Sequence, residues 1–107
     1  MLPQQDVFVQ HDMDTSPLGD PKGMISGINM VKIPADKVVS DTLATSVTAA
    51  ADNNSRLYRG IIASGDKFVA NAGEKQYISE LFGACACERE GAAIGQTAYI
   101  NGIPFGV

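Results

Sequence analysis

Hydrophobic and polar positions alternate in short stretches along most of the chain, and this period of two is typical of strands with one buried face. Residues 6–10 (DVFVQ) and 28–34 (INMVKIP) alternate in this way. Residues 57–64 (LYRGIIAS) and 67–72 (KFVANA) are predicted to be two further strands. A tight hairpin at Ser64-Gly65-Asp66 would join these two, because glycine next to a short polar residue favours such turns.

The carboxyl-terminal third is predicted to continue as β-structure. Its longest candidate strand is Tyr77–Glu90, bent at Gly83, and a helix over Glu74–Leu81 is the alternative. Further along, Asn101-Gly102 separates the stretches TAYI and IPFGV. Asn-Gly between β-prone residues favours a type I′ hairpin turn. Pro104 cannot donate a hydrogen bond to a neighbouring strand, so the last strand is expected at an edge of the sheet.

The segment Ser40–Asn54 has a different pattern. Ser40 suits the amino-terminal cap of a helix, and Leu43, Val47 and Ala50 recur at helical spacing. Three threonines in this segment lower its helix propensity, and the same residues also suit a strand or a loop. A short helix is predicted here.

The fold class predicted from these elements is mainly β: a small antiparallel β-barrel or sandwich with one short helix. A chain of 107 residues forms one domain, and its 11 glycines suit short strands joined by turns. Residues 1–27 contain several prolines, glycines and aspartates and are predicted to form an extended arm. Residues 28–107 would form the compact domain, and this division implies that residues 1–20 can be removed without unfolding it.

The formal net charge of −4 is concentrated at the amino terminus, where residues 1–20 hold four aspartates and no Lys or Arg. The rest of the chain is balanced, which argues against a nucleic-acid partner. No apolar stretch approaches the roughly 18 residues of a membrane span. The first ten residues also lack a basic stretch followed by an apolar one, so no secretion signal is expected.

Cys85 and Cys87 are the first candidates for chemistry. On a strand their Cα atoms would lie about 6.6 Å apart with parallel Cβ directions, which disfavours a disulfide. A metal site needs further soft ligands, and His11 is the only histidine. Both cysteines are therefore predicted to be small apolar residues on a buried strand face.

The other candidates are weaker. Asp12, Asp14 and Asp20 resemble a calcium-binding loop, but the final glutamate of such a loop is missing. Glu88 and Glu90 would share one strand face and are interpreted as surface charge. Because no catalytic triad, phosphate loop or metal cluster is recognisable, the chain is predicted not to be an enzyme and to hold no cofactor or metal.

The carboxyl-terminal half resembles the small β-barrel proteins of tailed-phage heads, which include decoration, cement and head-fibre base proteins. The resemblance covers roughly residues 57–107 and includes Ser64-Gly65-Asp66 with the apolar stretch that follows. Its other positions are Leu81, Gly83, Gly91, Gly95, Thr97, Tyr99, Gly102 and Phe105.

The resemblance implies a non-enzymatic virion protein that stabilises a shell of major capsid protein, as a homotrimer on the capsid surface. The arm would be its tether. The apolar anchors of the arm would be Phe8, Leu18, Met24 and Ile25. The alternative is a small soluble binding or regulatory β domain unrelated to a capsid, and an enzyme subunit completed by a partner is a third possibility.

Overall fold

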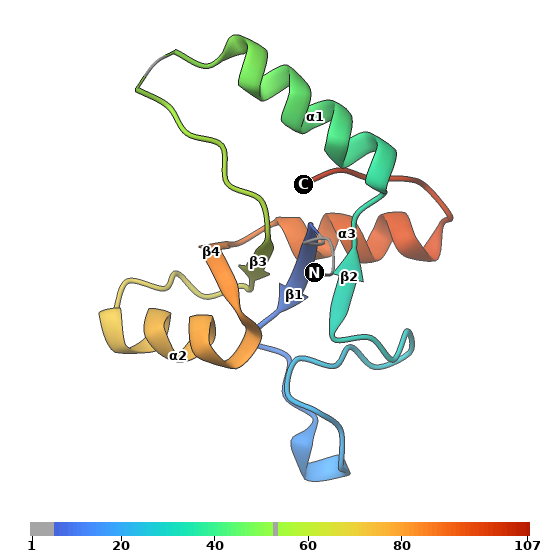
Figure 1. Ribbon diagram of the computed structural model, residues 1–107. Coiled ribbons are helices and arrows are strands. Elements are labelled where there is room, and N and C mark those ends of the chain that lie inside the picture. Colours follow the sequence, from blue (N-terminus) through green and yellow to red (C-terminus); the bar gives the residue numbers. More distant parts are fainter. Residues whose placement is uncertain (1–5, 53) are drawn as a thin grey trace, which may run out of the picture.

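The computed structural model describes residues 6–52 and 54–107 and shows a mixed α/β fold. Its elements in chain order are β1 (Val7–Gln10), the short 3-10 helix η1 (Ser16–Leu18), β2 (Lys32–Pro34), α1 (Lys37–Ala50), β3 (Ile61–Ser64), α2 (Ala72–Phe82), β4 (Ala84–Glu88) and α3 (Gly91–Ile100). The four strands form one open sheet in the order β2-β1-β3-β4 (Figure 1). The predicted mainly β barrel or sandwich is therefore wrong.

The sheet is mostly parallel. β1 pairs antiparallel with β2, whereas β1 and β3 are parallel, as are β3 and β4. Parallel neighbours need a long crossover connection, and α2 supplies it between β3 and β4. The predicted hairpin at Ser64-Gly65-Asp66 is therefore wrong, because the chain leaves the sheet there instead of turning back.

Helix α2 corrects the long predicted strand. The Asn71 side chain accepts a hydrogen bond from the Glu74 amide at 3.1 Å and so caps the first turn. Gly83, at φ +69°, ends the helix in the left-handed conformation that glycine adopts readily. The alternative of a helix over Glu74–Leu81 is thus confirmed, and only the part after Gly83 is a strand.

Helix α3 occupies the stretch that was expected to be a turn and a strand. Its buried positions are the small residues Gly91, Ala92, Gly95 and Ala98, which let the helix lie close to the sheet. A Cβ atom at Gly95 would already lie 3.3 Å from both Phe8 and Phe105. Asn101 and Gly102 form a turn that ends this helix, and a type I′ hairpin is excluded because φ of Asn101 is −95°.

The sheet has a small apolar core on each face. On the α2 side the core consists of Val9, Ala63, Ile78, Phe82 and Ala84, and on the α3 side of Phe8, Ile25, Ile33 and Ala92. β1 lies between β2 and β3 and contributes to both cores. Residues 1–5 of the proposed arm lie outside the described residues, and the division of the chain at residue 27 stays a prediction.

Helix α1 confirms the helix predicted over Ser40–Asn54, although it begins earlier. Asp36 caps it by accepting a hydrogen bond from the Val39 amide at 3.0 Å, while Ser40 is the one residue of the helix that is buried. Arg59 ties α1 to the sheet: its guanidinium donates to Asp6 at 2.9 Å and to Asp41 of α1 at 2.8 Å.

Candidate functional site

The carboxyl ends of β1, β3 and β4 meet at one edge of the sheet, and several polar side chains lie there, among them Asp12, Ser64 and Glu88. In open α/β sheets, ligands bind outside this edge. Backbone hydrogen bonds hold the three strand exits together: the His11 amide donates to Ser64 at 2.9 Å, and the Gly65 amide donates to Glu88 at 3.2 Å. We call this region the carboxyl edge.

Glu88, the last residue of β4, uses its carboxylate to hold the start of α3. It accepts hydrogen bonds from the amides of Glu90 at 2.9 Å and Gly91 at 2.8 Å. Partial burial opposes ionisation of Glu88, but the Ser64 hydroxyl and these amides outweigh it, so its pKa lies below the usual value. The amide of Ala92 donates to the Ser64 hydroxyl at 2.9 Å, which leaves the first turn of α3 well supplied with acceptors.

The loops that follow β1 and β3 are joined by Asp12. Its carboxylate accepts a hydrogen bond from the Asp66 amide at 2.8 Å. Partial burial raises the pKa of Asp12, yet hydrogen bonds from Gln10 and Asp66 lower it by more, and the net shift is downward. His11 is buried against Gly65, and its Nε2 atom has no hydrogen-bond partner among the described residues.

Glu90 contrasts with Glu88. It is exposed at the first turn of α3, and its carboxylate has no hydrogen-bond or ion-pair partner within residues 6–52 and 54–107. A hollow of about 430 Å³ lies between β4 and α2; it runs along β4 from Ala84 to Cys87 and is also bordered by Phe68 and Val69. Phe68 is 74% exposed, which is unusual for an aromatic side chain. Two groups are therefore free to contact a ligand: the carboxylate of Glu90 at the start of α3, and the ring of Phe68 beside this hollow.

The four proposed arm anchors do not form one surface. Phe8 and Ile25 are buried in the core on the α3 side, Met24 is half-buried, and Leu18 on η1 is exposed. Whether these side chains bind a partner stays a prediction.

Cys85 and Cys87 do lie on a strand, but both are exposed, so their predicted burial is wrong. A register shift between β3 and β4 leaves Cys85 without a pairing partner. Burial nevertheless raises the pKa of the Cys87 thiol above its usual value. The described residues contain no group of three or more His, Cys, Asp or Glu that could hold a metal ion.

Phe68 was not recognised from the sequence, and Glu88 and Glu90 were interpreted as surface charge, so none of the three was a candidate for binding. One feature of the sequence could have indicated this site. The polar segments Ser64-Gly65-Asp66 and Glu88-Arg89-Glu90 each follow directly after an apolar stretch. Polar residues that end buried parallel strands gather at one edge.

Comparison with known proteins gives a consistent result. The profile of the Phosphorylase superfamily matches residues 1–107. The aminodeoxyfutalosine nucleosidase of Campylobacter jejuni is 40% identical over 87 residues, which are 81% of this chain and 36% of that protein. The 5′-methylthioadenosine/S-adenosylhomocysteine nucleosidase of Treponema pallidum is 33% identical over 91% of this chain and 43% of its own length.

Solved structures agree with the sequence relatives. The Campylobacter jejuni 5′-methylthioadenosine/S-adenosyl homocysteine nucleosidase superimposes with a TM-score of 0.77 at 33% identity, over 97% of this chain and 46% of that one. A nucleosidase of the same description, assigned as putative, from Francisella philomiragia gives a TM-score of 0.81 at 29% identity, over 98% and 47%. The chain thus spans less than half the length of these relatives.

These matches overturn the resemblance to phage head proteins. The expectations that followed from it are wrong: a capsid decoration function, a major capsid protein as partner and a virion location. The alternative of a small soluble binding or regulatory β domain is not supported either, and the prediction that the chain is not an enzyme is contradicted by relatives that are nucleosidases. In the described residues, no helix is long and apolar enough to cross a membrane.

The match over residues 1–107, the relatives at 33–40% identity and the shared α/β sheet agree on one assignment. The chain belongs to the Phosphorylase superfamily.

Proposed function

We propose that this chain carries the nucleoside-binding edge of a nucleosidase, an enzyme that uses water to cleave the bond between a base and its ribose. The observation that carries the proposal is the unpaired carboxylate of Glu90 at the carboxyl edge of a parallel sheet, in a chain of this superfamily. Its relatives are named for two kinds of substrate, aminodeoxyfutalosine and 5′-methylthioadenosine or S-adenosylhomocysteine. We propose a nucleoside of one of these kinds as the substrate.

Glu90 is suited to bind the sugar. Two neighbouring ribose hydroxyls donate two hydrogen bonds, and one ionised carboxylate accepts both. Glu88 is less suited to this role, because its carboxylate already accepts the amides at the start of α3. The two carboxylates therefore have separate tasks: Glu88 fixes the helix and Glu90 faces the ligand.

Phe68 is suited to bind the base. Its exposed ring borders the hollow between β4 and α2, together with the half-buried Val69. A planar base stacks favourably on an aromatic face and gains from leaving water. Hydrolysis would then transfer the hydroxyl of water to the sugar carbon and a proton to the nitrogen of the departing base.

Binding measurements test the proposal. We expect the chain to bind 5′-methylthioadenosine, and Glu90→Gln to weaken this binding about tenfold or more, since hydrogen bonds to a charged group contribute about 1.5–3 kcal/mol each. Binding of free adenine should change little in this variant, because adenine has no ribose. Calorimetric titration measures both ligands.

Glu80→Gln is the matched control, because Glu80 is an exposed glutamate on α2. It should leave both affinities unchanged. A chain that binds neither ligand would contradict the proposal, as would equal losses of nucleoside and adenine binding in Glu90→Gln.

A further inference from the structure

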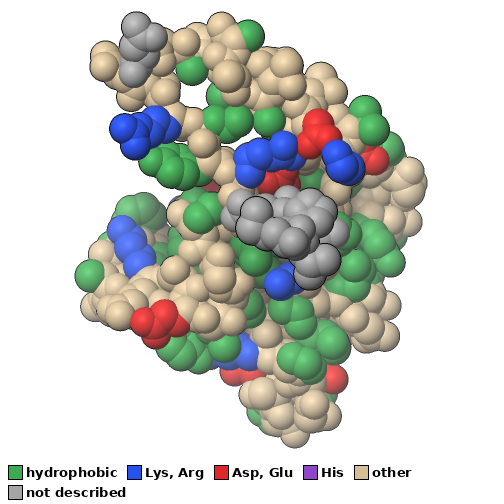
Figure 2. All heavy atoms as spheres, viewed as in Figure 1, with side chains coloured by type: hydrophobic (Ala, Val, Ile, Leu, Met, Phe, Trp, Pro, Cys, Tyr) green, Lys and Arg blue, Asp and Glu red, His purple; other side chains and the backbone are tan. Residues whose placement is uncertain are grey.

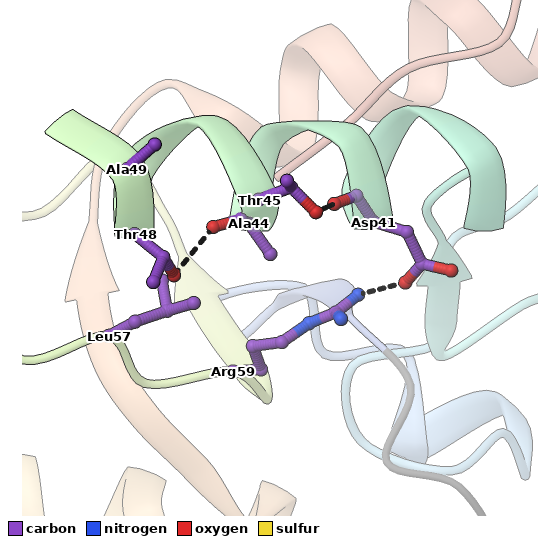
Figure 3. Close-up of a pocket in the computed structure, with 7 residues that line it drawn as sticks. All are labelled: Asp41, Ala44, Thr45, Thr48, Ala49, Leu57 and Arg59. Carbon is purple, nitrogen blue, oxygen red and sulfur yellow. Dashed lines mark hydrogen bonds and ion pairs between the residues drawn. The ribbon is translucent and has the colours of Figure 1, made fainter.

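The hollow between α1 and the segment that leads into β3 has a volume of about 730 Å³, but its polar side chains are already bonded. In the space-filling view the molecule is hollowed below α1, and basic and acidic side chains lie next to each other beside the gap (Figure 2). Figure 3 shows that Arg59 pairs with Asp41 and that the Thr48 hydroxyl donates to the carbonyl of Ala44. A ligand gains little from groups that already have partners. The two groups that are free to contact a ligand lie instead in the segments that leave the carboxyl edge.

Phe68 lies in a segment without regular structure, residues 65–71, which connects β3 to α2. Its ring is 74% exposed, so packing in a core does not fix it. Among residues 6–52 and 54–107, the Asp66 amide is the one backbone N–H of residues 66–70 that has a hydrogen-bond acceptor, and this acceptor is the carboxylate of Asp12 at 2.8 Å. The position of the backbone two residues before Phe68 therefore depends on Asp12.

The loops after β1 and β3 also touch where Gly65 passes His11. A Cβ atom at Gly65 would lie 2.6 Å from Nε2 of His11 and 2.9 Å from Cγ of Asp12, so glycine is needed for this close approach. Beyond Phe68, the half-buried Val69 packs against the core on the α2 side. The segment is thus held before and after Phe68, while the ring itself stays free.

Asp12 is itself held by side chains from β1 and α3. Gln10 donates to one oxygen of the Asp12 carboxylate, and the side-chain oxygen of Gln10 accepts a hydrogen bond from Gln96 of α3 at 3.1 Å. Gln10 and Gln96 are both half-buried, which strengthens such bonds because water competes less. One series of hydrogen bonds therefore joins α3 to the segment that carries Phe68.

We propose that Asp12 is a positioning residue, which fixes the ring of Phe68 relative to the carboxylate of Glu90. The inference rests on the proposed function, because these two groups are the contacts to the base and to the sugar there. Base and ribose are joined by a single bond, so both contacts form together only if the two groups keep a fixed separation. Affinity falls with the fraction of the chain that is in the binding conformation, and a loose segment lowers this fraction. Asp12 acts through the Asp66 amide and not by contact with the ligand.

Substitutions of Asp12 test this role. Asp12→Ala removes the acceptor of the Asp66 amide, and we expect it to lower the affinities for free adenine and for 5′-methylthioadenosine by the same factor, about fivefold or more. This result would distinguish Asp12 from Glu90, whose substitution should weaken binding of the nucleoside alone. Asp12→Asn keeps a side-chain oxygen that can accept the same hydrogen bond, so both affinities should stay within about threefold of those of the unsubstituted chain. Calorimetric titration measures both ligands.

A second measurement follows the segment itself in the chain without ligand. NMR order parameters of the backbone amides of residues 66–68 should be about 0.85 in the unsubstituted chain and below about 0.6 in Asp12→Ala. Asp12→Asn should restore the higher value. This measurement reports the position of the segment whether or not a nucleoside binds.

Asp14→Ala is the matched control. Asp14 is an exposed aspartate that also accepts a backbone amide, that of Ser16 at 3.0 Å, but this bond lies within the loop after β1. Its substitution should change neither the affinities nor the order parameters. Unchanged adenine affinity or unchanged order parameters in Asp12→Ala would overturn this inference alone, and so would a loss that Asp12→Asn does not restore. An unsubstituted chain that binds neither ligand would instead overturn the proposed function, and with it the role of Asp12 in binding.

Discussion

At the scale of single residues, the protein places acidic groups where backbone amides stabilise them. The amides at the start of α3 have their partner in Glu88, and the loop after β3 has its partner in Asp12. In both cases the pKa of the carboxyl group is held down by hydrogen bonds that outweigh partial burial. Gly91 allows this arrangement, because a Cβ atom there would collide with the ring of Phe8.

The pH dependence of stability follows from Glu88. Its pKa in the folded protein lies below the unfolded value of about 4.5, so its stabilising effect is complete above that value and is lost as the pH falls through the folded pKa. We expect Glu88→Gln to cost about 1 kcal/mol at pH 7 and to flatten the loss of stability below about pH 5. Urea unfolding between pH 3 and pH 7 measures both effects. An unchanged pH profile in Glu88→Gln, with Glu80→Gln alongside, would contradict this account.

At the scale of elements, α1 and α2 have similar caps but different surroundings. Asp36 caps α1 and Asn71 caps α2, each by accepting one backbone amide. α2 buries Ile78 and Phe82 in the core, whereas α1 buries only Ser40. The stability of α2 is therefore part of global folding, while α1 can open by itself.

Cap substitutions separate these two cases. Asn71→Ala should lower the global free energy of unfolding by about 1 kcal/mol. Asp36→Ala should mainly speed hydrogen exchange of the α1 amides and leave global stability within about 0.5 kcal/mol. Amide exchange by NMR and urea unfolding report the two quantities. Equal losses of global stability in both variants would show that α1 is an integral part of the core.

At the scale of the whole molecule, the sheet depends on a strand from the amino-terminal region. β1 pairs with both β2 and β3, and Val7 and Val9 are almost completely buried. From the sequence we expected residues 1–20 to be removable without unfolding the domain. From the structure we expect their removal to unfold it. The side chains on both faces of β1 contribute a large part of the apolar surface that so small a protein can bury.

Truncation tests the role of β1. A chain without residues 1–20 should lose cooperative thermal unfolding, because β2 and β3 would no longer be joined. Leu18→Ser is the control within the same region: Leu18 is 81% exposed on η1, and its substitution should change stability by less than about 0.5 kcal/mol. Circular dichroism during heating distinguishes the outcomes. Cooperative unfolding of the truncated chain near the midpoint of the intact chain would refute the central role of β1.

The sequence by itself determined the local features that depend on near neighbours. Alternation identified β1 and the apolar stretch of β3, the helical spacing of Leu43 and Val47 identified α1, and Gly83 marked a real boundary. Asn101-Gly102 also marked a real chain reversal, although it ends a helix. These features follow from periodicity and from backbone preferences, and both can be recognised in a stretch of a few consecutive residues.

Only the tertiary structure decided how these elements pair. Strand direction is set by contacts between distant segments, and the helix that includes residues 97–100 lies on the sheet because Ala92 and Gly95 fit against Phe8 and Ile33. The same four letters suit a strand when no sheet lies beneath them. The carboxyl edge, and with it the pairing of Glu88 with α3 and the exposure of Glu90, exists only once three strands run in one direction.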